Sequence, residues 1–306
     1  MNTSLEKFEG VIPAFYACYD EDGNISPQRI KDLTNYYIKK KVKGLYVNGS
    51  SGECIYLNVQ ERKLVLENVM EVARGKLTVI CHVACNSTRE SMELAAHAQS
   101  LGVDAIAAIP PIYFKLPVWG IVDYWNDISK AANDTPFVIY NIPQLAGVAL
   151  TPEIYKEMMK NPNVIGVKNS SMTVYDIQIF SEMGGDGRIV FNGPDEQFLA
   201  GRLMGAGAGI GGTYGAMVEL YLKLNELIKE NRLEDAKALQ FDINRCIAKL
   251  LGFHANMYAV IKEVLRINEG IDVGSVRSPL TALKGEEKEK VKEVAEFIQN
   301  TINKYL

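Results

Sequence analysis

The stretch Asn163-Val-Ile-Gly-Val-Lys-Asn-Ser-Ser171 guides the interpretation of the rest of the chain. Val164, Ile165 and Val167 form a short apolar run of β-branched side chains, which is typical of a buried strand rather than a helix. Lys168 ends this run, and small polar residues follow it. A lysine at the tip of a buried strand has two interpretations. It is either a surface residue whose ammonium group reaches water, or a partly desolvated amine that attacks a carbonyl and forms a Schiff base.

The Schiff-base interpretation requires a large change in the pKa of this amine. A free lysine has a pKa near 10.4, so almost none of it is neutral at pH 7. Lowering the pKa to around 7 takes about 4–5 kcal/mol of differential interaction. Low-dielectric neighbours on adjoining strands are the usual source of such a change. The stretch alone leaves both interpretations open, and the rest of the chain has to distinguish them.

Apolar runs typical of strands recur at fairly even intervals, and stretches typical of helices separate them. The eight runs cover residues 10–19, 43–48, 77–83, 103–109, 136–141, 164–168, 188–192 and, more weakly, 207–212. Ser26-Pro27, Ser87 and Thr151-Pro152 indicate helix starts, because each supplies an N-cap residue. Eight strands alternating with helices predict an α/β fold, a (β/α)8 TIM barrel. A doubly wound parallel sheet is the alternative, because periodicity does not show whether a sheet closes.

The alternation of strands and helices stops after Tyr214. Residues 220–251 and 258–267 have amphipathic helical patterns with no strand between them, and a final helix is expected over residues 286–306. We therefore predict a barrel over residues 1–215 and a C-terminal α-helical extension over residues 216–306. The extension is expected to pack on the barrel as one structural unit, with its apolar stripes serving as packing surfaces.

Composition and charge exclude several classes of protein. The 306 residues carry a net charge of −4, so there is no basic surface that would suggest nucleic acid. No apolar stretch is long enough to span a bilayer, and the first ten residues lack the apolar core of a signal peptide, which predicts a cytoplasmic protein. The five cysteines are scattered and are expected to be reduced. The three histidines form no cluster, so no metal site is expected.

Short polar turns follow several of the predicted strands. They are Gly49-Ser50-Ser51-Gly52-Glu53, Pro110-Pro111-Ile112-Tyr113, Tyr140-Asn141-Ile142-Pro143 and Gly193-Pro194-Asp195-Glu196. Any one of these is compatible with an ordinary tight turn. In a barrel, however, the chemistry is located at the carboxyl ends of the strands, where all of these turns and Lys168 are predicted to lie. Their common position therefore indicates an active site.

Two glycine-bearing segments have different interpretations. The Ser50-Ser51 turn offers hydroxyls and backbone N–H groups, which suit a bound carboxylate. The GAGIGG segment at 207–212 matches the dinucleotide fingerprint, but it lies at the last strand and no βαβ unit with an acidic residue follows it. Its glycines are interpreted as permitting close backbone packing near the site.

The turns together resemble the N-acetylneuraminate lyase/dihydrodipicolinate synthase family of class I aldolases. The matching motifs are GSSGE at 49–53, YNIP at 140–143 and GVKNSS at 166–171. Strand order and the helical tail extend the resemblance over essentially the whole chain. The resemblance implies a (β/α)8 barrel, a homotetramer, and no metal or organic cofactor. Within the family, the chain is most similar to the branch that cleaves sialic acid.

The resemblance also implies roles for individual residues. Lys168 would be the Schiff-base lysine, Tyr140 the phenol that moves the proton at the cleaved bond, and Tyr113 a tyrosine that supports this relay. The remaining positions are implied to contact substrate: Ser50 and Ser51 at the pyruvate carboxylate, with Ser50 also counted as catalytic, Ser170, Gly193, the acidic pair Asp195 and Glu196 at the sugar hydroxyls, Gly212, and Tyr258 over the site.

Three departures from the family pattern bear on the substrate. Leu145 stands where dihydrodipicolinate synthases carry an arginine for a substrate carboxylate, which counts against that activity. Gly212 stands where some sialate lyases carry a serine, and Pro194 lies inside GPDE, so the preferred sugar acid stays open.

The implied reaction is Schiff-base retro-aldol cleavage of N-acetylneuraminate to N-acetylmannosamine and pyruvate. The alternatives within the family are dihydrodipicolinate synthase or another 2-keto-3-deoxy sugar acid pyruvate aldolase. A catalytically silent barrel that serves as a binding protein is the alternative from another class. Such a protein would be free to lose Lys168 and Tyr140, and this chain retains both.

Overall fold

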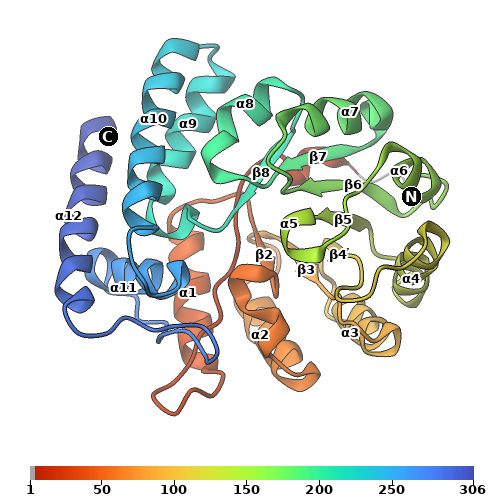
Figure 1. Ribbon diagram of the computed structural model, residues 1–306, viewed down its shortest axis with the longest axis horizontal. Coiled ribbons are helices and arrows are strands. Elements are labelled where there is room, and N and C mark those ends of the chain that lie inside the picture. The colour runs from red at the N-terminus through yellow and green to blue at the C-terminus, as the bar shows by residue number, and fades with distance from the viewer. Residues whose placement is uncertain (1–3) are drawn as a thin grey trace. The chain divides into compact units, whose positions relative to one another are not determined.

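Eight parallel strands form the central sheet of the fold (Figure 1). The computed structural model describes residues 4–306. The strands are β1 (Gly10–Pro13), β2 (Gly44–Val47), β3 (Thr78–His82), β4 (Ala105–Ala108), β5 (Phe137–Asn141), β6 (Val164–Asn169), β7 (Ile189–Asn192) and β8 (Ala208–Gly211). They lie in the order β1-β8-β7-β6-β5-β4-β3-β2. The Lys43 N–H donates to the Val11 carbonyl at 3.0 Å, which brings β1 next to the residue before β2. The sheet is therefore a nearly closed TIM barrel, as predicted.

Helices connect the strands and form the C-terminal part of the chain. They are α1 (Pro27–Lys39), α2 (Val59–Ala73), α3 (Thr88–Ser100), α4 (Val118–Ala131), α5 (Pro143–Ala146), α6 (Pro152–Met158), α7 (Val174–Gly184), α8 (Phe198–Leu203), α9 (Val218–Lys229), α10 (Leu233–Leu250), α11 (Met257–Glu269) and α12 (Glu287–Tyr305). The predicted starts at Ser26, Ser87 and Thr151 are confirmed, because each side chain accepts a hydrogen bond from a backbone N–H of the first helical turn.

The structure differs from the sequence prediction at two element boundaries. The run at 10–19 contains only the four-residue strand β1. Residues 14–19 are buried but belong to no named strand, and the prediction was too long because apolar side chains indicate burial and not strand pairing. The range 220–251 contains two helices, α9 and α10. Asn231 separates them with a φ of 56°, a left-handed conformation that asparagine tolerates better than most residues.

The chain divides into two compact units. The first unit comprises the residues up to Ile12, Lys43–Val47 and Thr78–Gly211, and it contains β2–β8 and most of β1. The second comprises Pro13–Val42, Asn48–Leu77 and Gly212–Leu306, and it contains α1, α2 and α9–α12. The division predicted from the sequence, at residue 215, remains a prediction.

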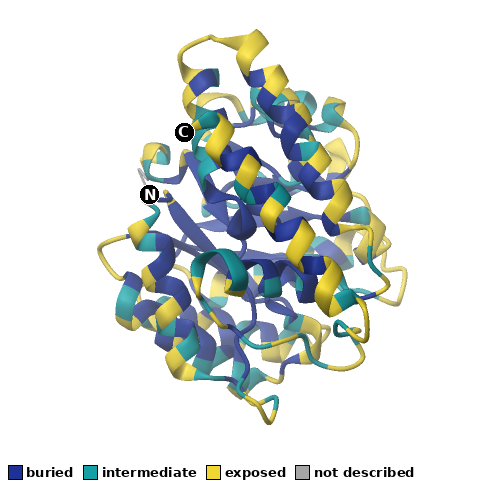
Figure 2. Cartoon of the chain, turned by 90° about the vertical axis from the view of Figure 1, so that its left-hand side faces the viewer, coloured by how far each residue is buried: buried dark blue, intermediate teal, exposed yellow. Residues whose placement is uncertain are grey.

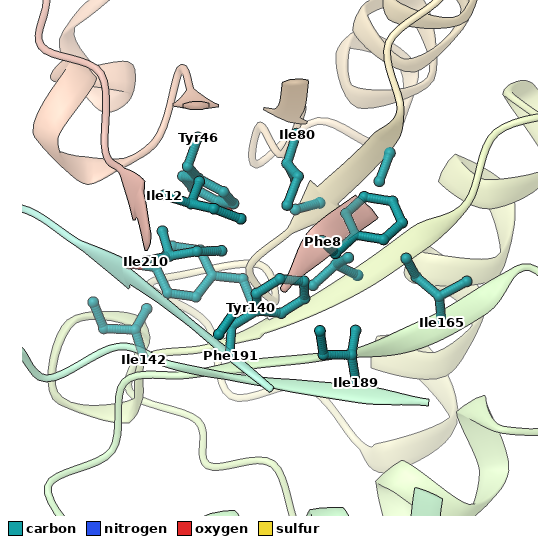
Figure 3. Packing of buried hydrophobic residues seen from close by; sticks show 14 of the residues in the cluster. Phe8, Ile12, Tyr46, Ile80, Tyr140, Ile142, Ile165, Ile189, Phe191 and Ile210 are labelled. Carbon is teal, nitrogen blue, oxygen red and sulfur yellow. The ribbon is translucent and has the colours of Figure 1, made fainter. Parts of the chain in front are cut away.

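A continuous apolar cluster fills the interior of the first unit. Figure 2 shows the strands as buried, and Figure 3 shows side chains from several of them converging. Phe8, which precedes β1, packs edge-on against Phe191 of β7 with ring centroids 6.4 Å apart. The cluster consists of Phe8, Ile12, Tyr46, Ile80, Ala105, Ala107, Val138, Tyr140, Ile142, Ala146, Ile165, Ile189, Phe191, Ala208 and Ile210. It sets a low-dielectric environment for any polar side chain that shares this interior.

Candidate active site

Lys168 lies on the barrel-interior face of β6 because of an irregularity in the pairing of β5 with β6. Phe137 of β5 pairs with Val164 of β6, and the next residue of β5, Val138, pairs with Gly166. Ile165 is therefore an extra residue in β6. A bulge of this kind reverses which face the following side chains occupy. Ile165 and Val138 both belong to the interior cluster, and the next in-register pair on that face joins Tyr140 to Lys168. Without the bulge, Lys168 would point away from the interior.

Gly166 permits the close packing that accompanies this bulge. Its φ is 155°, and a Cβ at this position would lie 1.8 Å from the carbonyl oxygen of Ile189 on β7. Only glycine fits such an approach of two backbones. Gly166 of the GVKNSS motif is thus required for the bulge that turns the Lys168 side chain toward the barrel interior.

The amine of Lys168 is buried among aromatic rings. Its Nζ lies 3.6 Å from the ring centroid of Tyr140 and 5.0 Å from that of Tyr46, and it donates to the Ser170 hydroxyl at 3.3 Å. The residue is 5% exposed. Desolvation lowers the pKa of Lys168 to about 7, and the carboxylate of Asp195 opposes this change. The interpretation as a surface lysine is therefore wrong, and a large fraction of the amine is neutral and nucleophilic at physiological pH.

Two further rings surround Tyr140, and sequence reasoning did not select them. Tyr46 of β2 and His82 of β3 lie edge-on to Tyr140, with ring centroids 5.7 Å and 5.9 Å away. The Ile109 N–H donates to His82 Nε2 at 3.4 Å, which assigns that nitrogen as an acceptor. Both residues lie near the carboxyl ends of their strands, and this position is the signal that could have indicated them.

The turn after β7 brings a carboxylate to the same interior. The Gly193 N–H donates to the Asn169 carbonyl at 2.8 Å, and a Cβ on Gly193 would lie 2.0 Å from the Ser170 hydroxyl. Asp195 is buried and acts electrostatically on Lys168, whereas Glu196 is exposed. The structure therefore brings Lys168, Tyr140, Ser170, Gly193 and Asp195 together, and it separates the environments of the two acidic residues.

Tyr113 and Leu145 have different surroundings from this group. Tyr113 is 90% exposed, has a φ of 82°, and packs against Phe114 with ring centroids 5.0 Å apart. Within the described chain, the structure does not bury Tyr113 with Lys168. Leu145, in α5, is also exposed and supplies no positive charge.

The second unit contains the other predicted residues, and it brings three of them together. Ser50 and Ser51 begin the short 3-10 turn η2 (Ser50–Gly52). The Ser51 hydroxyl donates to the phenolic oxygen of Tyr258 on α11 at 3.2 Å. A Cβ on Gly212 would lie 3.1 Å from the Ser51 hydroxyl, so Gly212 adjoins the same pair. Hydroxyls from segments far apart in sequence thus form one polar group that suits a carboxylate.

The described residues offer no alternative centre based on metal ligands. Among residues 4–306, no group of three or more His, Cys, Asp and Glu side chains has the arrangement of a metal site. The five cysteines are free, which agrees with the prediction that they are reduced. None of the described helices has the length and apolar character needed to cross a membrane.

Comparison with known proteins identifies the family. The model of the Dihydrodipicolinate synthetase family matches residues 7–298. The chain belongs to this family. It is 63% identical over 303 residues to the N-acetylneuraminate lyase of Mediterraneibacter gnavus, covering 99% of this chain and 96% of that one. It is 34% identical over 270 residues to the N-acetylneuraminate lyase of Escherichia coli (strain K12 / DH10B), covering 88% of this chain and 90% of that protein.

Solved structures of family members have the same fold. The wild-type sialic acid aldolase of Ruminococcus gnavus superposes with a TM-score of 0.97 at 63% identity, covering 98% of this chain and 100% of that one. The Clostridium difficile protein CdNal in complex with mannosamine superposes with a TM-score of 0.90 at 29% identity, covering 97% of this chain and 99% of that one. These similarities confirm the family resemblance that the three motifs carry.

Replacing the buried amine should change how stability depends on pH. Because the pKa of Lys168 falls from 10.5 to about 7 on folding, the unfolded chain binds a proton that the folded chain lacks between those values. The wild type therefore gains stability as pH rises through this window, and the penalty at pH 7 or below is about 4–5 kcal/mol. Lys168→Met should be more stable than wild type near pH 7, and the difference should shrink toward pH 10.

Urea unfolding at a series of pH values measures this difference. Lys160→Met is the matched control, since the side chain of Lys160 is 68% exposed and should show no comparable trend. A difference between Lys168→Met and wild type that stays constant across the window would contradict the assigned environment of the amine.

Proposed function

We propose that the protein is a class I aldolase that cleaves N-acetylneuraminate to N-acetylmannosamine and pyruvate. The observation that carries the proposal is the amine of Lys168, buried 3.6 Å over the ring of Tyr140 with a pKa of about 7. Such an amine is suited to nucleophilic attack on a carbonyl. The substrate is inferred from the relative that is 63% identical over 99% of this chain, an N-acetylneuraminate lyase.

The proposed mechanism uses Lys168 as the electron sink. Its neutral Nζ attacks the keto carbon of the open-chain sugar acid, and loss of water forms a protonated imine. Tyr140 takes the proton from the C4 hydroxyl, the C3–C4 bond breaks, and its electrons move to the imine. N-acetylmannosamine leaves and the enamine of pyruvate remains. Protonation at C3 and hydrolysis then release pyruvate and free Lys168, so the proposal assigns no step to a metal or organic cofactor.

The other predicted residues have substrate-binding roles in this proposal. Ser50 and Ser51 bind the carboxylate of the pyruvate part, and the hydrogen bond from Ser51 to Tyr258 supports that role. Ser170 shares a hydrogen bond with the amine, and Asp195 lies close enough to influence its charge. The remaining assigned positions are Gly193, Glu196 and Gly212, with Tyr113 in the proton relay. A cytoplasmic location remains a prediction.

An observation at α5 argues against the dihydrodipicolinate synthase alternative. That reaction condenses pyruvate with aspartate semialdehyde, whose charge calls for a cation in the site. Leu145 is exposed at the position where the other branch carries arginine, and a leucine cannot pair with a carboxylate. Sugar hydroxyls call instead for acceptors, which the carboxylates of Asp195 and Glu196 provide.

The function is tested by trapping and product analysis. Borohydride with pyruvate should label Lys168 and no other lysine, as read by peptide mass mapping, and Lys168→Ala should abolish both labelling and cleavage while remaining folded. Incubation with N-acetylneuraminate should yield pyruvate and N-acetylmannosamine, whereas condensation of pyruvate with aspartate semialdehyde should be negligible. Labelling of a different lysine would refute the mechanism. Efficient condensation without sialate cleavage would move the chain to the other branch of the family.

The role of the phenol has its own test. Tyr140→Phe should fold normally and lose turnover by a factor of about 10² or more, because it removes a general acid/base while keeping the ring beneath Lys168. Steady-state kinetics on N-acetylneuraminate measure the loss. Tyr155→Phe serves as a control, since Tyr155 is an equally buried tyrosine in α6 that has no assigned role. Near wild-type turnover in Tyr140→Phe would show that Tyr140 only packs.

We further propose that the protein assembles as a homotetramer. Aromatic side chains are exposed in the segment from β4 to the start of α4: Tyr113 at 90%, Phe114 at 72% and Trp119 at 69%. Exposed apolar side chains that gather in this way mark interaction surfaces, and aromatic residues are enriched at the centres of interfaces. Burial between subunits would remove this surface from water.

Charge placed in this segment should weaken assembly. Trp119→Arg is expected to shift the protein to smaller species, because a charge would be desolvated at the interface. Sedimentation velocity at several concentrations measures the distribution of species. Phe241→Arg is the control, since Phe241 in α10 is exposed without exposed aromatic neighbours in sequence. A wild-type monomer at all concentrations would contradict the tetramer.

A further inference from the structure

The second unit contains a fully buried ion pair that the proposed mechanism does not use. Lys262 on α11 donates to Glu53 at 2.8 Å, and their side chains are 1% and 0% exposed. The two residues are 209 positions apart in the chain. Desolvating two charges is costly, and an apolar pair of similar volume is often at least as stable. The pair therefore calls for an explanation other than stability, and setting the register between two segments is the best-attested role of such pairs.

Both members of the pair make further hydrogen bonds within the second unit. Glu53 accepts from the Tyr19 hydroxyl at 3.1 Å and from the Arg277 N–H at 2.9 Å, in addition to Lys262. Lys262 also donates to the Ser275 carbonyl at 2.7 Å. Burial and the Glu53 carboxylate raise the pKa of Tyr19, which keeps its phenol protonated as the donor. We call Glu53, Lys262, Tyr19 and Arg277 the Glu53 network.

The Glu53 network holds the end of the Ser50–Gly52 turn. Glu53 has a φ of 54°, a left-handed conformation that is strained for a residue other than glycine. Its N–H donates to the Ser50 carbonyl at 3.0 Å, which closes the turn. Such a conformation persists only where the surroundings determine it, and here three donors hold the side chain in place. The backbone of the turn therefore depends on the carboxylate of Glu53.

The same network sets the position of α11 relative to the turn. Lys262 lies four residues after Tyr258, so the two side chains share one face of the helix. Tyr258 accepts a hydrogen bond from Ser51 at 3.2 Å. The turn and the helix are thus joined twice, by the buried ion pair and by the Ser51–Tyr258 hydrogen bond one helical turn away.

We propose that Glu53 and Lys262 are positioning residues that hold Ser50, Ser51 and Tyr258 in the arrangement that binds the substrate carboxylate. This inference rests on the proposed function, because it assumes that the three hydroxyls bind that carboxylate. The Glu53 network contacts no reacting atom. It acts by fixing the register of the turn and the helix, and small misplacements of binding groups reduce substrate binding strongly.

The test compares two ketones in the Lys168 trapping reaction. Pyruvate carries the carboxylate, and acetone has the same methyl ketone without it. The double variant Glu53→Gln/Lys262→Met removes both charges, so no unpaired charge is left buried. It should raise the half-saturating concentration of pyruvate by about tenfold or more, and leave acetone trapping near wild type. Tyr19→Phe, which removes a single hydrogen bond to Glu53, should raise the half-saturating concentration of pyruvate by about threefold.

A second ion pair of the same unit provides the control. Lys304 on α12 donates to Asp242 on α10 at 2.7 Å, and neither helix carries the turn or Tyr258. Lys304→Met should leave pyruvate trapping unchanged, whatever it does to stability.

The outcomes separate the inference from the function on which it rests. Unchanged half-saturation by pyruvate in both network variants would overturn the inference alone. Equal losses with pyruvate and acetone would also overturn it, because they indicate a general structural effect. Failure of wild-type Lys168 to be labelled would overturn the proposed function, and this inference with it.

Discussion

The burial of one amine over one aromatic ring is the interaction on which the proposed chemistry depends. Lys168 reaches the ring of Tyr140 only because Ile165 bulges out of the register with β5 and Gly166 allows β7 to approach. The apolar cluster around this position supplies the low dielectric that disfavours the ammonium form (Figure 3). Packing of the barrel interior and reactivity of the amine are therefore consequences of the same arrangement.

The two buried lysines show that the groups around a buried amine determine its role. Lys168 and Lys262 are 5% and 2% exposed, and burial lowers the pKa of both. Lys262 has a carboxylate at 2.8 Å, which favours its charged form and makes it a structural cation. Lys168 has aromatic faces, one hydroxyl, and the charge of Asp195, which only partly opposes the effect of burial. Burial therefore dominates, and the pKa of Lys168 falls to about 7.

Much of the fold could be predicted because its signals are local. Each of these signals lies within a few residues of sequence: short β-branched runs, N-caps followed by proline, and the change of pattern after Tyr214. The seven strands after β1 lie within one or two residues of their predicted bounds, whereas the run at 10–19 was too long. The Tyr46 and His82 rings beside Tyr140 were not predicted. The sequence of an apolar strand is the same whether its aromatic residue packs in the core or lies beside a reactive group.

The sequence by itself determined that strands and helices alternate, and that Lys168 and the YNIP and GSSGE turns stand at strand ends. These properties follow from residue type and short-range order. Only the tertiary structure decided that Lys168 faces the interior, that Asp195 is buried while Glu196 is exposed, and that Glu53 pairs with a lysine 209 residues away. The reason is that a bulge, a strand register and a long-range ion pair depend on how distant segments meet, and no periodicity within a segment encodes that.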